Sequence, residues 1–240
     1  MSSCIFKLKR DALIIAFALG ASGAAQAALI TNGFTFAVAS SGSNQDVGSH
    51  FHSNTGGSFG NPAGKAEVGR FSSEEVRGLS EYNITGLGAV ASAFVTFDIF
   101  KAGGLFNGTN DTPFTGSIIV DAYAGNNQED ISDYQGASLG QVGTFNVTSG
   151  VNLVGDVFSF DITSLLNAAI GANDLSFGIR LREDRGNADY AFSKAWTFED
   201  FRLTTDNQCA GASCQVPEPG SLALLGLGLA GLAAARRRKR

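Results

Sequence analysis

Val95-Thr96-Phe97-Asp98-Ile99 alternates apolar and polar side chains, the pattern of a strand with one buried and one solvated face. Other segments show the same alternation, or run as short apolar stretches between Gly, Asn and Asp residues. The expected strands are residues 34–39, 66–71, 89–100, 117–124, 139–147, 157–162, 175–181 and 196–204. Many strands at this spacing predict a mainly β domain, an antiparallel β-sandwich of jelly-roll-like topology.

Two segments of the body depart from the strand pattern. Residues 161–170 predict one short helix, with Thr163 or Ser164 as its N-cap and Gly171 as its stop. Residues 40–64 are rich in Ser, Gly and Asn and predict a flexible surface loop. The β-sandwich body is expected to span residues 28–206.

The charge of the chain is unevenly distributed. Residues 28–215 contain 9 Lys and Arg against 20 Asp and Glu, whereas the remaining basic residues lie in the first 27 and last 5 positions. A body with a net charge of −11 would repel phosphate backbones, so a nucleic-acid partner is not expected.

The first 27 residues have the three parts of a secretory signal. Lys7, Lys9 and Arg10 precede an apolar helical run over residues 12–19. The small side chains of Ala25 and Ala27 then predict cleavage before Ala28. We therefore expect residues 1–27 to be a signal peptide that directs export.

The C-terminal stretch reads Val216-Pro217-Glu218-Pro219-Gly220, followed by 15 uncharged residues over 221–235. As a helix those 15 residues would rise about 22 Å, slightly less than the bilayer core. Five cations follow, Arg236, Arg237, Arg238, Lys239 and Arg240. They predict a stop-transfer signal that holds this end in the cytoplasm beyond a transmembrane helix in the inner membrane.

This order of Pro-Glu-Pro, apolar helix and basic tail resembles the PEP-CTERM sorting signal, over residues 216–240. The resemblance implies a Gram-negative producer of exopolysaccharide and an exosortase, a membrane enzyme that cuts near Pro217, Glu218 and Pro219. These three would be recognition residues, with the catalysis supplied by the exosortase. The two prolines deny helical hydrogen bonds and would keep the strip extended and accessible.

Cys209 and Cys214 remain once Cys4 leaves with the signal. In an oxidising compartment such a pair is expected to form a disulfide, here within a linker over residues 207–215. A metal site would need more ligands than these two thiols.

Residues 116–205 carry a second resemblance. Phe158-Ser159-Phe160-Asp161-Ile162-Thr163, a short helix and the two strands that follow resemble the back half of carbohydrate-binding-module-like jelly rolls. The resemblance implies the fold, and it raises sugar binding as an alternative role in which Trp196, Tyr190, Tyr134 or Tyr123 stacks on a sugar ring.

Two segments offer candidate metal ligands. His50 and His52 would share one face if they lay on a strand, but two ligands without a third favour solvated loop residues instead. Glu129, Asp130 and Asp133 gather oxygen donors in one loop, where either a structural calcium or an ordinary polar turn would account for them.

No motif of a hydrolase, phosphate-binding loop or zinc protease occurs in the sequence. Glu183, Asp184 and Asp189 are possible carboxylates for glycoside hydrolysis, but the neighbouring Arg182 and Arg185 favour local ion pairs. We expect no enzyme and no cofactor beyond a possible calcium. The expected function is a structural or adhesive protein of the cell surface or extracellular matrix; the alternative is a module that binds exopolysaccharide.

Overall fold

A computed structural model describes residues 29–205, apart from residues 32, 43 and 58, and every strand in this part belongs to one antiparallel sheet. The strands are β1 (Leu29–Thr31), β2 (Gly33–Ser41), β3 (Asn44–Ser53), β4 (Ala66–Phe71), β5 (Glu74–Asn83), β6 (Phe94–Lys101), β7 (Gly116–Gly125), β8 (Ser138–Val147), β9 (Val157–Asp161), β10 (Ser176–Glu183) and β11 (Ala195–Thr204). A 3₁₀ helix, η1 (Ile131–Gln135), and an α-helix, α2 (Thr163–Ala172), complete the described part. The predicted mainly β fold with one short α-helix is confirmed.

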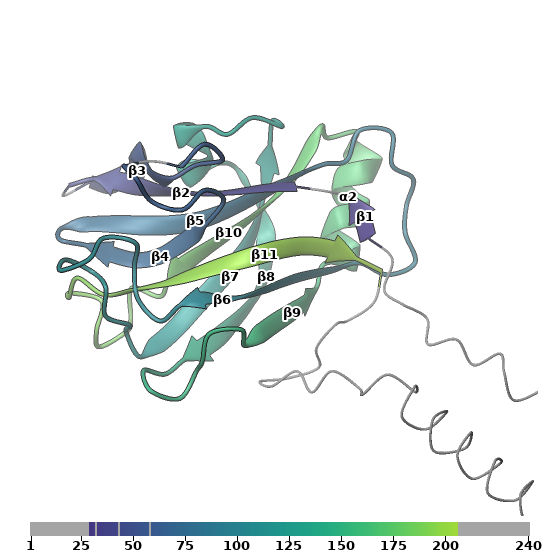
Figure 1. Ribbon diagram of the computed structural model, residues 1–240. Coiled ribbons are helices and arrows are strands. Elements are labelled where there is room, and N and C mark those ends of the chain that lie inside the picture. The colour runs from purple at the N-terminus through teal and green to yellow at the C-terminus, as the bar shows by residue number, and fades with distance from the viewer. Residues whose placement is uncertain (1–28, 32, 43, 58, 206–240) are drawn as a thin grey trace, which may run out of the picture. The chain divides into compact units, whose positions relative to one another are not determined.

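The sheet curls until its two ends approach each other (Figure 1). Its strand order is β8-β7-β10-β5-β4-β11-β6-β9, and the terminal strands β8 and β9 contact one another. The two halves pack face to face as in a sandwich, yet they are continuous because β4 pairs with β11. The result is a sandwich whose layers are one sheet, closed nearly into a barrel.

The core lies between these halves and follows from the alternation in β6. Val95, Phe97 and Ile99 are completely buried, and the Phe97 ring centroid lies 4.7 Å from that of Phe201 and 5.6 Å from that of Phe198. Phe145, Phe158 and Phe160 pack around the same ring. The Phe-rich composition therefore supplies one aromatic core that joins both halves of the sheet.

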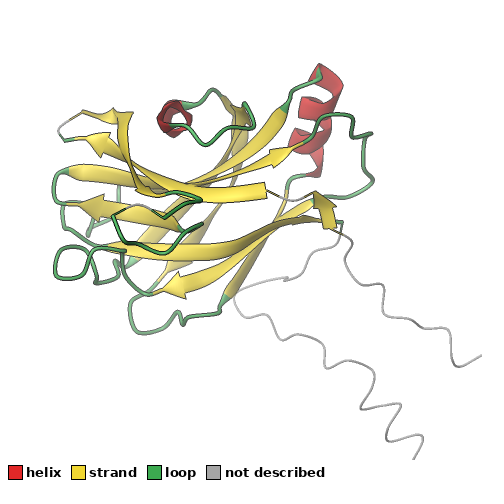
Figure 2. Cartoon of the chain, turned by 45° about the horizontal axis from the view of Figure 1, so that its top comes forward, coloured by secondary structure: helices red, strands yellow, loops and turns green. Residues whose placement is uncertain are grey.

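η1 covers the outer face of the sheet, and both helices lie outside the strands (Figure 2). A second apolar cluster joins η1 to the sheet and contains Phe36, Val38, Leu79, Tyr123 and, from η1 itself, Tyr134. Two arginines bind the last carbonyls of η1: Arg77 Nη1 donates to the Tyr134 oxygen at 2.8 Å, and Arg180 Nη1 donates to the same oxygen at 3.1 Å. These buried cations therefore serve to dock a short helix that could not otherwise satisfy its end.

The predicted caps of α2 are wrong, although the helix itself is where the sequence places it. Thr163 is the first helical residue, and its hydroxyl accepts from the Ala93 backbone N–H at 2.9 Å instead of capping. Asp161 Oδ1 accepts from the Thr163 backbone N–H at 2.9 Å. The helix continues through Gly171 and ends where Asn173 adopts a left-handed conformation with φ of 61°.

Residues 40–64 do not form the predicted flexible loop. Asn44–Ser53 is strand β3, which pairs with β2, and both His52 and Ser53 are buried. β5 was also not predicted, because the charged residues Glu75, Arg77 and Glu81 interrupt the apolar pattern by which a strand is recognised. Conversely, residues 89–93 were expected to open a strand but form a loop before β6.

The expected signal peptide, cysteine linker and C-terminal anchor (1–27, 207–215 and 216–240) lie outside the described residues. Within residues 29–205, with the three gaps given above, no helix is long and apolar enough to cross a membrane.

Candidate metal centre and sorting motif

His50 and His52 lie on β3 and share one face of that strand, since side chains two residues apart in a strand point the same way. Their ring centroids are 5.3 Å apart. The His52 side chain is 1% exposed and the His50 side chain 38% exposed. The prediction of solvated loop residues is therefore wrong about position for both histidines, which lie on a strand, and wrong about burial for His52.

Glu74 supplies the third ligand that the sequence did not reveal. It is the first residue of β5, directly after the tight turn that joins β4 to β5. Its Oε2 atom lies 3.7 Å from His50 Nε2 and 4.0 Å from His52 Nε2. Over the part of the chain that the structure describes, this is the one group of three metal-ligating side chains whose ligand atoms lie within 4.8 Å of one another.

A buried carboxylate contacts the Nδ1 atom of His52 and orients its ring. His52 Nδ1 lies 3.2 Å from Glu67 Oε2, and Glu67, on β4, is completely buried. Asn110 Nδ2 donates to the other oxygen of Glu67. Because a carboxylate only accepts, this contact places an N–H on Nδ1 of the imidazole, and Nε2 is the ring nitrogen on the side of Glu74.

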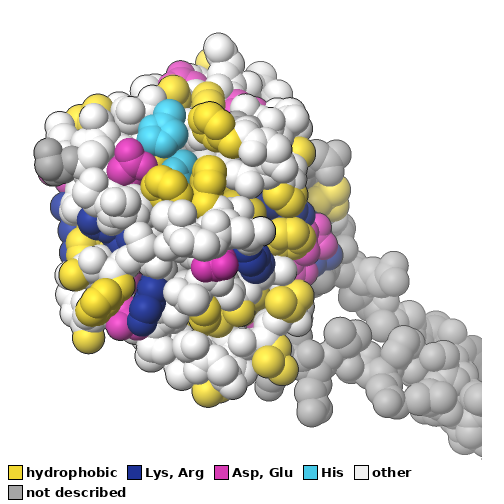
Figure 3. Space-filling model, turned by 60° about the vertical axis from the view of Figure 1, so that its left-hand side comes forward, with side chains coloured by type: hydrophobic (Ala, Val, Ile, Leu, Met, Phe, Trp, Pro, Cys, Tyr) yellow, Lys and Arg dark blue, Asp and Glu magenta, His cyan; other side chains and the backbone are white. Residues whose placement is uncertain are grey.

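Aromatic rings surround the buried histidine. Phe106 and Phe71 meet the His52 ring in edge-to-face contacts at centroid distances of 4.6 and 5.2 Å. Figure 3 shows the histidine side chains (cyan) beside acidic (magenta) and hydrophobic (yellow) side chains on this face. The cluster therefore opens to solvent on the side of His50 and Glu74 and is closed by apolar groups around His52.

The three carboxylates proposed as calcium ligands do not converge. Glu129 accepts from the backbone N–H and the hydroxyl of Thr55, at 2.9 and 2.6 Å. Asp130 caps η1 through a hydrogen bond of 2.6 Å from the Ser132 backbone N–H. Burial and the neighbouring Glu81 raise the pKa of Asp133, which disfavours the charged form that a calcium ligand needs. Glu129 and Asp130 thus have the separate hydrogen-bond partners of an ordinary polar turn.

The acidic residues near the end of β10 also have separate roles. Glu183 is buried, and burial raises its pKa to about 7. Asp189 accepts from Lys194 at 3.0 Å. The neighbouring arginines do not form the expected local pairs, because Arg182 binds Asp121 on β7 and Arg185 binds Glu75 on β5.

Three of the four aromatic residues considered for sugar stacking are buried. Trp196, Tyr123 and Tyr134 are completely buried, and Trp196 Nε1 donates to the Phe114 carbonyl oxygen at 2.8 Å. Tyr190 is partly buried, and its hydroxyl donates to Glu75 Oε2 at 2.7 Å. Trp196 therefore packs in the core, and of the four residues named for the glycan alternative Tyr190 alone keeps part of its surface exposed.

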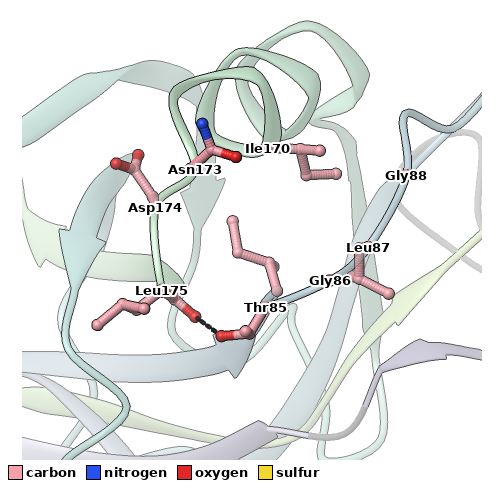
Figure 4. A pocket seen from close by; sticks show the side chains of 9 residues that line it. Thr85, Gly86, Leu87, Gly88, Ile170, Asn173, Asp174 and Leu175 are labelled. Atoms are coloured by element: carbon pink, nitrogen blue, oxygen red, sulfur yellow. Dashed lines mark hydrogen bonds between the residues drawn. The ribbon is translucent and has the colours of Figure 1, made fainter.

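A small hollow lies between the turn after β5 and the C-terminal end of α2 (Figure 4). Its volume is about 280 Å³, and its walls are residues 84–88, Ile170 and residues 173–175. Thr85 Oγ1 donates to the Leu175 carbonyl oxygen across it at 3.3 Å. With Asp174 as its one ionisable residue, the hollow lacks the convergent polar groups of a ligand site.

The remaining predicted site residues lie outside the described residues. They are the cleavage-site residues Ala25, Ala27 and Ala28, the cysteines Cys209 and Cys214, the sorting residues Pro217, Glu218 and Pro219, and the terminal cations Arg236, Arg237, Arg238, Lys239 and Arg240.

Comparison with known families bears on this C-terminal stretch. Residues 215–239 match the PEP-CTERM protein-sorting motif, and the matched range contains Pro217, Glu218 and Pro219. No curated protein matches the chain. The motif marks an exported protein that an exosortase sorts.

Proposed function

We propose that the body is a non-catalytic structural or adhesive protein that the sorting system delivers to the cell surface or extracellular matrix. The observation that carries the proposal is the sorting motif at residues 215–239. The tail would hold the protein in the inner membrane during transit, and an N-terminal signal peptide over residues 1–27 would start its export.

The distribution of charge supports a role outside the cell without catalysis. Residues 28–215 carry a net charge of −11, which keeps copies apart and soluble after release. The buried Glu75 is paired within the fold, with Arg77 and Arg185 at 2.6 and 2.9 Å. These contacts are a structural use of charged side chains.

The proposal is tested by removing the sorting signal in cells that contain an exosortase. We expect deletion of residues 216–240 to abolish delivery to the cell surface and matrix, as measured by fractionation and immunoblotting. A matched variant, Pro217→Ala with Glu218→Gln and Pro219→Ala, keeps the apolar helix and basic tail and should also fail to reach the surface. Unchanged surface delivery of either variant would refute the proposal.

The structural role needs its own readout. Cells that lack the protein should form a matrix of weaker cohesion, and the wild-type chain should restore it. Purified protein should show no saturable binding to isolated exopolysaccharide. Saturable binding would support the glycan-binding alternative and contradict the proposed role.

A further inference from the structure

We propose that His50, His52 and Glu74 form a binding site for a divalent first-row transition metal ion, with Zn²⁺ as its representative. The site goes beyond the sorting and structural role, because it lies on β3 and β5 of the body rather than in the sorting tail. Two imidazoles and one carboxylate are a donor set that zinc accepts, and such a three-ligand set leaves a fourth position for water.

The distances between the ligand atoms fit this assignment. Atoms bound to one tetrahedral Zn²⁺ at about 2.0–2.1 Å lie about 3.3 Å from each other. The Glu74 Oε2 atom is 3.7 Å from His50 Nε2 and 4.0 Å from His52 Nε2. All three ligand atoms lie within 4.8 Å of one another, so closing the gaps needs at most about 1.5 Å of movement. The partly exposed side chains of His50 and Glu74 can supply it by torsional changes.

His52 is built into the fold in the orientation that a ligand needs. Glu67 accepts from Nδ1 and so fixes the tautomer in which Nε2 is free to bind the ion. Asn110 holds Glu67 from its other side. Glu67 and Asn110 are both completely buried, as positions dedicated to orienting a neighbour are expected to be.

The charge around the cluster is an independent argument for a cation. Glu67 and Glu74 both pair with the histidines, and no Lys or Arg of the described residues pairs with either carboxylate. No permanently charged side chain therefore offsets the negative charge of these two carboxylates. A divalent ion would balance both negative charges, and the apolar rings of Phe71 and Phe106 would strengthen that attraction by excluding water.

The test is a Zn²⁺ titration of the full chain, purified without a histidine tag, stripped of metal and alkylated at its cysteines so that thiols cannot bind. Isothermal titration calorimetry should give one Zn²⁺ per chain. His50→Ala and Glu74→Gln should each weaken binding at least about tenfold. Glu67→Gln, which changes only the positioning partner, should weaken it by about 10- to 100-fold while circular dichroism keeps the β-sheet spectrum.

Asp200→Asn is the matched control, because Asp200 is an exposed carboxylate on β11 with φ of 53°, a conformation that Asn also adopts. Its affinity for Zn²⁺ should equal that of the wild type. The proposal is overturned if the wild-type chain takes up no Zn²⁺, or if His50→Ala and Glu74→Gln bind it as tightly as Asp200→Asn does.

Discussion

His52 Nδ1 on β3 and Glu67 Oε2 on β4 lie 3.2 Å apart, and both side chains are almost completely excluded from solvent. The contact joins a Ser- and Gly-rich segment to the sheet by a hydrogen bond between ionisable groups. Together with the backbone pairing of β3 with β2, it holds residues 44–53 in the sheet although their sequence lacks an apolar repeat.

The network around Glu75 predicts a large loss of stability when its charge is removed. Burial opposes the charged form of Glu75, but Arg77, Tyr190 and Arg185 outweigh it and lower the pKa below its usual value of 4.5. Glu75→Gln should reduce the free energy of unfolding at pH 7 by about 3–5 kcal/mol, measured by urea denaturation. The difference should shrink as the pH falls below 4.5, because the wild-type carboxyl then gains a proton.

A control for this prediction lies in the same network. Asp46 pairs with Arg185 at 2.8 Å, but its side chain is 77% exposed. Asp46→Asn should cost less than about 1 kcal/mol, since exposed ion pairs contribute little. If Asp46→Asn lowered the free energy of unfolding as much as Glu75→Gln does, the prediction that Glu75 stabilises this network most would be wrong.

Glu183 should make the protein less stable as the pH rises. Burial raises its pKa from 4.5 to about 7, so the fold favours the protonated acid. That contribution is complete below pH 4.5 and is lost as the pH rises through about 7. Between pH 4.5 and 8, the free energy of unfolding of Glu183→Gln should therefore rise by about 3 kcal/mol relative to wild type. Parallel pH profiles in urea denaturation would refute the assignment.

Trp196 should act through the core rather than through a surface ligand. Trp196→Phe leaves the Phe114 carbonyl oxygen without its donor and should cost about 1–3 kcal/mol in urea denaturation. Phe192→Ala is the control, because Phe192 is 57% exposed and its loss should change stability by no more than about 0.5 kcal/mol. A Trp196→Phe chain as stable as wild type would show that this contact does not hold the core.

The junction between the two halves of the sheet depends on Gly69. Gly69 pairs with Ala195 with φ of 137°, and an added Cβ would lie 2.3 Å from the Lys194 carbonyl oxygen. Gly69→Ala should cost at least about 1–3 kcal/mol from backbone strain, visible as a lower Tm. Gly88→Ala, which meets open space, should leave the Tm unchanged. Similar Tm values for the two variants would argue against a strained junction.

The success of the sequence-based predictions depended on how far apart the stabilising partners lie. Residues 66–71 were predicted with the bounds that β4 has, because the sequence pattern that predicts a strand lies within the segment itself. β5 was missed because its charged residues are buried by partners more than 50 residues away, such as Tyr134 for Arg77. The metal cluster was missed for the same reason, since Glu74 reaches His50 only after the sheet has formed. The sequence offered one local indication of the position of Glu74, the tight turn that joins β4 to β5.

The mass of the mature protein, recovered from cells with an intact exosortase, tests the account most directly. We expect a chain that begins at Ala28 and ends near Pro219, which identifies residues 215–239 as a processing signal and the β body as the delivered product. A mass that still includes residues 221–240 would contradict this account, because the tail would then be a permanent membrane anchor.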